Sequence, residues 1–324
     1  LASRLTMAGL EVEGVEPACP PFSGVVVGEV VSCERHPDAD KLTVCRVEDG
    51  SGSPLQVVCG APNVRPGLRS AFARVGAVLP GGLKIKRAKL RGVESAGMLC
   101  SARELGLGEG HEGILELPGE LAAGTDLRAA LALDDAILEV NVTPNRGDAL
   151  SILGIAREVA AIAAARLATP PAEPVASALK ERLEVRLGAA PEACPRFAGR
   201  VLRGLRSDAR TPLWMCERLR RSGLRPISPI VDVTNYVMLE LGQPMHAYDL
   251  RRIAGYIEVR WAREGERLSL LDGRTVELSG DVLVIADADG PVGAAGIMGG
   301  ERSGIAADTT DVFLEVAYFA PEAV

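Results

Sequence analysis

Several features that would place this sequence in a common class of protein are missing from it. No run reaches the ~18 uncharged apolar residues of a membrane-spanning helix, and the first residues form no secretory signal. The seven Cys residues include no Cys-x-x-Cys pair, which predicts reduced thiols in a soluble, cytoplasmic protein. Because only three His residues are present, a zinc site has few ligands and no metal is expected.

Common motifs for phosphate binding and for serine hydrolases are also missing. The glycine-rich segment 293–300 has neither the Lys-Ser/Thr of a P-loop nor a Gly-x-Gly-x-x-Gly register, so it predicts no phosphate site. No Gly-x-Ser-x-Gly motif accompanies His246, so a serine-hydrolase triad is poorly supported.

The 324 residues allow two or three domains. Because the chain opens on Leu1 and stops after a strand-like run, we expect a fragment.

Positive charge is concentrated in one stretch of a chain whose net charge is -7. Residues 50–93 contain no Asp or Glu and eight Lys or Arg. A basic surface of this kind attracts phosphates, and a solvated face is the alternative. The residues that we predict to contact phosphates are Lys84, Lys86, Arg87, Lys89 and Arg91.

Residues 22–130 read as short strands separated by turns. The predicted strands are 25–31, 42–47, 55–59, 71–75 and 83–90, a pattern typical of a small closed barrel. In the last of them a period of two places Lys84 and Lys86 on one face. His36, Asp38 and Asp40 predict a turn rather than a metal site, because they lack further ligands.

A helix, a linker and a mixed α/β region follow. Residues 149–167 show helical spacing, with Asp148 as the expected N-cap and Pro170-Pro171 as the stop. Residues 168–180 are rich in Pro and Ala and predict a linker. A helix is expected from Pro212 to residue 219.

The last part of the chain predicts strands and one charged residue among apolar ones. Asp272-Gly273 is typical of a type I′ hairpin turn. Residues 282–286 and 312–319 predict strands, and Glu315 shares a face with Phe313 in the second. A carboxylate there needs a partner, a pKa shift or a ligand, although a strand-edge position or a structural ion pair is the alternative.

Six segments in order resemble the family of bacterial phenylalanyl-tRNA synthetase β subunits. They are TMAGLEVEG at 6–14, HPDADKL at 36–42, VCGAPN at 58–63, VTPNR at 142–146, VDVTNY at 231–236 and GQPMHA at 242–247. The resemblance runs along essentially the whole chain. It implies that the first N-terminal segment and the later domains, which bind the α subunit, are missing here.

The resemblance implies a multidomain α+β fold. The expected parts are a small N-terminal domain (1–20 plus 133–168), an inserted OB-fold tRNA-binding module (22–130), a linker (169–184) and a B3/B4-like editing domain (185–324). Family members hydrolyse tyrosine wrongly attached to tRNA(Phe), while the α subunit of an α2β2 enzyme charges tRNA with ATP and Mg²⁺. We expect this fragment to bind neither cofactor.

The resemblance also implies an editing pocket. It places catalytic roles on Thr234, Asn235, His246 and Gly296, and substrate contacts on Pro244, Ala295 and Glu315. Phe313 joins the substrate-binding set because it shares the face of Glu315. Two other functions stay open: a non-catalytic RNA-binding scaffold, and a hydrolase that acts on small esters without RNA.

Overall fold

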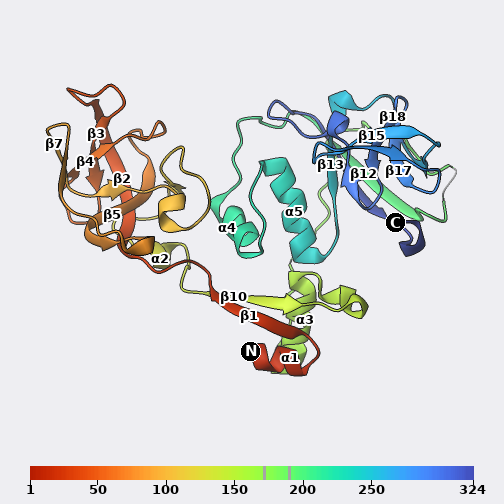
Figure 1. The fold of residues 1–324 in the computed structure, drawn as a ribbon, viewed down its shortest axis with the longest axis horizontal. Coiled ribbons are helices and arrows are strands. Elements are labelled where there is room, and N and C mark those ends of the chain that lie inside the picture. The colour runs from red at the N-terminus through yellow and green to blue at the C-terminus, as the bar shows by residue number, and fades with distance from the viewer. Residues whose placement is uncertain (171–172, 189–190) are drawn as a thin grey trace. The chain divides into compact units, whose positions relative to one another are not determined.

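The structure is a computed structural model that describes residues 1–170, 173–188 and 191–324. The chain divides into two compact units. Unit 1 comprises 1–141 and 212–225, and unit 2 comprises 142–211 and 226–324 (Figure 1). No helix in the described ranges is long and apolar enough to span a membrane.

A curled, OB-like sheet forms most of unit 1. Its strands are β2 (Ser23–Arg35), β3 (Thr43–Glu48), β4 (Leu55–Cys59), β5 (Arg69–Val78), β8 (Met98–Leu99) and β9 (Glu116–Leu117). Their order is β4-β3-β2-β5-β8, with β9 also paired to β5. The Ala96 N–H donates to the Gln56 carbonyl and ties the residues before β8 to the β4 edge. The predicted α+β class with an OB-like module is therefore confirmed.

The apolar run at the start of β2 is explained by burial on both faces. Val25 and Val27 pack in one hydrophobic cluster with Ala71, whereas Val26 and Val30 pack in a second with Phe72. A strand covered on both sides reads as a continuous rather than an alternating apolar run. β2 is consequently the central strand of the barrel.

Shorter elements complete unit 1. They are α1 (Ala2–Met7), β1 (Glu11–Pro17), η1 (Pro80–Gly82), β6 (Ala88–Leu90), β7 (Val93–Ser95), η2 (Arg103–Leu105), α2 (Leu127–Ala130) and β10 (Ala136–Asn141). β1 pairs with β10 across more than a hundred residues of sequence, in an antiparallel ladder. The barrel is therefore an insertion between two paired strands.

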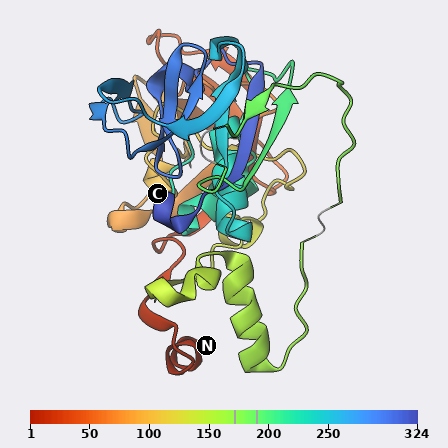
Figure 2. The ribbon, with the colours of Figure 1, turned by 90° about the vertical axis from the view of Figure 1, so that its right-hand side faces the viewer.

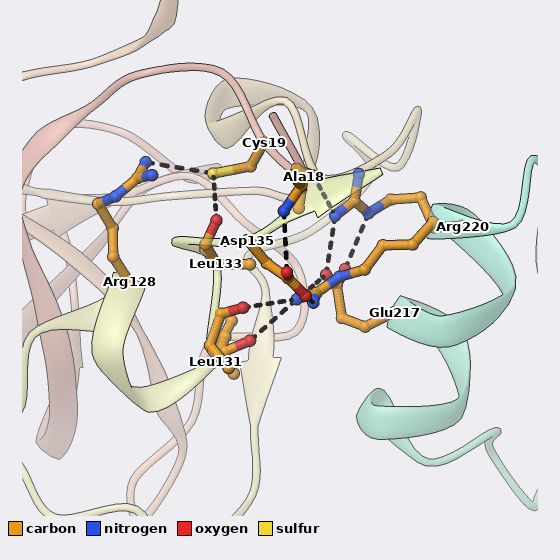
Figure 3. Close-up of polar contacts among 11 residues, drawn as sticks. Ala18, Cys19, Arg128, Leu131, Leu133, Asp135, Glu217 and Arg220 are labelled. Carbon is orange, nitrogen blue, oxygen red and sulfur yellow. Dashed lines mark hydrogen bonds and ion pairs between the residues drawn. The ribbon is translucent and has the colours of Figure 1, made fainter. Parts of the chain in front are cut away.

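Helix α4 (Leu213–Arg221) also belongs to unit 1, although the chain on both sides of it belongs to unit 2. Arg220 pairs with the buried Glu217 at 2.9 Å and donates to the Ala18 carbonyl at 2.8 Å. Arg221 donates to the carbonyls of Leu131 and Ala132, each at 3.1 Å (Figure 3). This ionic cluster fixes α4 to the two segments that flank the barrel.

The described residues of unit 2 form three sheets. β11 (Val185–Arg186), β14 (Ile257–Trp261), β17 (Leu283–Asp287), β18 (Gly290–Ala294) and β19 (Met298–Gly299) form a five-stranded sheet. A three-stranded sheet has the order β12 (Arg196–Leu202), β20 (Val312–Tyr318), β13 (His246–Asp249). β15 (Glu266–Ser269) and β16 (Thr275–Leu278) form a hairpin.

Helices and a long connection complete unit 2. The helices are η3 (Pro144–Ala149), α3 (Ile152–Ala163), α5 (Pro229–Leu241), η4 (Leu250–Arg252), η5 (Glu301–Ser303) and η6 (Pro321–Ala323). Between α3 and β11 the described residues form no helix or strand (Figure 2). The linker expected at 168–180 falls in this stretch, with residues 171–172 outside the described ranges, and its role between domains stays a prediction.

Two local predictions about the α3 helix were wrong. The N-cap is Ser151, whose hydroxyl accepts from the Gly154 N–H at 3.0 Å, because the carboxylate of Asp148 instead pairs with Arg146. The helix ends at residue 163, where Ala164 adopts φ 52°, well before the expected proline stop. Pro171 of that stop lies outside the described residues.

Two predictions about strands and turns also need correction. Residues 83–90 are not one strand, because Lys84 forms a single bridge to Val78 and only residues 88–90 belong to β6. At the tip of the β15–β16 hairpin, Gly273 has φ 83° but Asp272 does not have a positive φ. A type I′ turn needs positive φ at both residues, so this is a longer loop closed by a left-handed glycine.

Candidate functional site

The basic hairpin, residues 84–95, carries the five predicted tRNA-binding side chains. Lys84, Lys86, Arg87, Lys89 and Arg91 are all exposed. Buried Ile85 holds the segment in place: its N–H donates to the Ala77 carbonyl and its carbonyl accepts from the Gly76 N–H, both at 2.8 Å. The structure therefore brings the five cations together on one solvated element.

Half of the positive charge predicted for residues 50–93 is neutralised by carboxylates from elsewhere in unit 1. Arg65 pairs with Glu116, Arg69 with Glu29, Arg74 with Asp49 and Arg87 with Glu94. Lys84, Lys86, Lys89 and Arg91 have no ion-pair partner among the described residues. Of eight cations, four are thus left for a ligand, and all four lie on the basic hairpin.

The tip of the basic hairpin holds an unfavourable backbone conformation. Arg91 has φ 47° and Gly92 has φ 83°, which is the pattern of a type I′ turn. A side chain in the left-handed region is destabilising by roughly 1 kcal/mol, and Asn or Gly is the usual occupant. The backbone conformation of Arg91 therefore does not stabilise the fold.

A second candidate site lies in unit 2, where β20 runs between β12 and β13. Glu315 is opposite Gly199 on one neighbour and His246 on the other. Phe313 is opposite Tyr248 and packs with it and Ala295 in one hydrophobic cluster. The predicted side chains Phe313, Glu315, His246 and Ala295 are therefore brought together around one apolar core.

Glu315 is buried and hydrogen-bonded. The hydroxyl of Tyr248, on the neighbouring strand, donates to Oε2 of Glu315. Burial raises the pKa of Glu315 to about 7, and the bond from Tyr248 opposes this rise. The alternative of a strand-edge carboxylate in solvent is excluded, since Glu315 is only 6% exposed.

His246 is the second polar group of this site. Its ring meets that of Tyr248 edge-on, with centroids 4.5 Å apart. Burial lowers the pKa of His246 to about 4, so its imidazole is neutral at physiological pH. Its Nε2 atom is buried and has no hydrogen-bond partner in the described part of the chain. A neutral, unpartnered nitrogen of this kind can accept a hydrogen bond from a bound water.

Gly299 makes room for the His246 ring. A Cβ atom at residue 299 would lie 2.4 Å from Cε1 and 2.6 Å from Nε2 of His246, so no larger residue fits. Sequence reasoning missed both Gly299 and Tyr248. For Tyr248 the signal was available, since residues 246 and 248 of a strand point to the same side.

The remaining predicted residues form no hydrogen bond with Glu315 or His246 in the part of the chain that the structure describes. Thr234 is buried in α5 and its hydroxyl donates to the Val231 carbonyl within the helix. Asn235 is also on α5, which contacts β13, and Pro244 lies in the exposed loop between them. Gly296 has φ 71° and packs against Phe319. No group of three His, Cys, Asp or Glu side chains within the described ranges could hold a metal ion.

Comparisons with known proteins match the two parts of the chain that contain these sites. Residues 25–126 match the family model of a putative tRNA binding domain, and residues 193–324 match that of the B3/4 domain. A weaker structural match, an N-terminal fragment of the phenylalanyl-tRNA synthetase β subunit from Pyrococcus horikoshii, covers 58% of this chain and 57% of that one. Its TM-score is 0.34 at 18% identity, and the assignment does not depend on it.

Curated relatives match the chain along its length. The phenylalanine–tRNA ligase β subunit of Methylococcus capsulatus is 58% identical over 99% of this chain, and that of Pseudomonas fluorescens is 60% identical over 98%. The chain covers 40% of each of these two relatives. With such identity over its whole length, the chain belongs to the family of phenylalanine–tRNA ligase β subunits.

Proposed function

We propose that the chain is the tRNA-binding and editing portion of a phenylalanine–tRNA ligase β subunit. In this proposal residues 22–130 bind tRNA and residues 185–324 hydrolyse tyrosine that has been attached to tRNA(Phe). The observation that carries it is the buried Glu315 carboxylate, which already accepts a phenolic hydrogen bond from Tyr248 in an aromatic core. A site that binds one phenol in this way is suited to recognise another.

The hydrolysis we propose uses a positioned water rather than a protein nucleophile. The water adds to the ester carbonyl, the bond to the ribose oxygen breaks, and tyrosine and the free tRNA hydroxyl leave. His246 orients this water through its unpartnered Nε2, since a group with a pKa of about 4 is too weak a base to act alone at neutral pH. Backbone donors near Gly296 and a terminal hydroxyl of the tRNA stabilise the developing charge.

The wider assembly is part of the same proposal. We infer that the β subunit joins an α subunit in an α2β2 enzyme of the cytoplasm, where the α subunit charges tRNA with ATP and Mg²⁺. The decisive experiment is deacylation of tyrosyl-tRNA(Phe) by this chain, with and without added α subunit. RNA binding without ester cleavage in either case would favour the non-catalytic scaffold, and cleavage of simple esters without RNA would favour a small-molecule hydrolase.

The basic hairpin should give RNA binding a measurable salt dependence. Replacing Lys84, Lys86 and Lys89 with Ala is expected to flatten the slope of log K against log salt by about two to three, since each phosphate contact contributes about 0.7 to 0.9. Arg91→Asn should flatten it by about one contact and leave the unfolding free energy unchanged or up to about 1 kcal/mol higher. An unchanged slope in both variants would assign the hairpin to solvent or to a protein partner.

Discrimination between tyrosyl and phenylalanyl esters should depend on pH. The carboxyl group of Glu315 is proposed to accept a hydrogen bond from the substrate phenol. Because its pKa is raised to about 7, this group is mostly protonated at pH 6 and mostly ionised at pH 8. The ratio of the two hydrolysis rates should therefore rise about tenfold over this interval. The spontaneous alkaline cleavage of each ester, measured without the protein, is subtracted before the ratio is taken. His246, with its pKa lowered to about 4, stays neutral throughout. A flat ratio would contradict the assignment of Glu315.

A further inference from the structure

Unit 2 contains a pocket of about 560 Å³ beside β12, an edge strand of the three-stranded sheet. One wall is the segment 179–185, with Leu183 and Val185, and the other is β12 with Val201. Phe313 contributes its ring to the apolar lining. The volume lies within the range of about 300–1,000 Å³ that is common for small-ligand sites.

The rim of this pocket is positively charged. Lys180 and Arg182 line it and have no hydrogen bond or ion pair with any described residue. Arg200, also at the rim, donates only to the Val175 carbonyl. The one acidic lining residue, Glu181, is paired with Arg203. Cations without partners beside an apolar cavity suit a ligand with a phosphate and an uncharged ring or sugar.

The pocket is also adjacent to the proposed editing residues. Gly199, in its wall, is the residue directly opposite Glu315 on β20. A Cβ atom at residue 199 would lie 2.1 Å from Cζ of Phe313, so the Phe313 ring fills the space beside the glycine. Neighbouring strands are about 4.8 Å apart, so the pocket wall at Gly199 lies one strand spacing from Glu315 in the sheet.

We propose that this pocket binds the phosphate backbone of the single-stranded 3′ end of a tRNA whose terminal ester is presented to Glu315 and His246. Lys180 and Arg182 contact phosphate oxygens, and the ribose and base pack on Leu183 and Val201. The assignment of tRNA as the source of the phosphate rests on the proposed editing function. The charge and shape of the pocket do not depend on it.

The test uses the double variant Lys180→Ala/Arg182→Ala. Its matched control, Arg206→Ala/Arg267→Ala, removes the same charge from exposed positions of unit 2 outside the pocket. A fluorescent single-stranded RNA ending in CCA should bind the double variant about tenfold more weakly, about threefold for each of the two solvent-exposed charge contacts that are lost. The slope of log K against log salt should fall by about 1.4, since single strands contribute about 0.7 per contact. The control should match the unchanged chain.

A second measurement separates this proposal from the editing function. With tyrosyl-tRNA(Phe), the double variant should raise KM about tenfold and leave kcat unchanged. If the unchanged chain does not deacylate tyrosyl-tRNA(Phe), the editing function fails, and the RNA titration still decides the pocket. Equal RNA binding by the variant and the control would overturn the pocket assignment. Displacement of the RNA by AMP or inorganic phosphate at equal concentration would overturn the tRNA end as its ligand.

Discussion

Glu315→Ala is expected to lower the ratio of tyrosyl-tRNA to phenylalanyl-tRNA hydrolysis by about 5-fold to 150-fold. Tyrosine differs from phenylalanine by one hydroxyl, and a site that hydrogen-bonds a hydroxyl rejects the analogue that lacks it. Glu315 keeps its hydrogen bond from Tyr248 with either substrate, and a phenylalanyl ester lacks only the second donor that the substrate phenol supplies, a difference on the order of 1 to 3 kcal/mol. Single-turnover deacylation of the two substrates measures the ratio directly.

Two companion variants sharpen this experiment. Tyr248→Phe removes the resident phenol but keeps the carboxylate, so the preference for tyrosyl-tRNA should survive. His246→Ala should slow both substrates alike, because it removes the group that orients water. If Glu315→Ala lowers both rates equally and leaves the ratio unchanged, Glu315 is structural or catalytic rather than a specificity residue.

Glu217→Ala is expected to destabilise unit 1 by about 3 to 5 kcal/mol, the range for removing one partner of a buried ion pair. Glu217 is the anion between Arg220 and Arg221, whose side chains are each 20% exposed. Without it two guanidinium groups remain close together against backbone carbonyls. Glu94→Ala is the matched control within unit 1, since Glu94 is 44% exposed and pairs with Arg87, which is 66% exposed, so little change is expected.

The sequence allows this destabilisation to be measured in unit 1 alone. Its two tryptophans are divided between the units, with Trp214 on α4 and Trp261 on β14 of unit 2. In a Trp261→Phe background, the fluorescence of Trp214 reports denaturant unfolding of unit 1. A midpoint that does not move with Glu217→Ala would mean that apolar packing, and not the ionic cluster, holds α4.

Predictions from the sequence succeeded where one local signal was enough. The apolar runs of the barrel strands and the apolar residues on both faces of β20 around Glu315 are properties of consecutive residues, and both were found in the structure. Charge was harder to predict, because Arg65 and Arg69 meet carboxylates that are about 40 to 50 positions away in the chain. Whether a cation is available to a ligand therefore depends on the fold.

Partners on neighbouring strands were also hidden from the sequence. Nothing in residues 312–319 indicates that Tyr248 is the donor to Glu315, since the pairing of β13 with β20 decides it. The N-cap of α3 was missed for a more local reason. Asp148 and Ser151 are both good caps, and the choice between them depends on which side chain Arg146 engages.

The placement of α4 affects both limited proteolysis of this protein and the design of chimaeras between homologous chains. The chain passes between the two units after residues 141, 211 and 225. One protease nick in the 168–180 connection therefore leaves the fragments joined by α4, which stays bound among the segments around Ala18 and Leu131. If residues 142–324, which contain unit 2, were exchanged between homologous genes as one continuous segment, a foreign α4 would be exchanged with them. Such chimaeras should be viable only when residues 212–225 come from the same parent as the barrel.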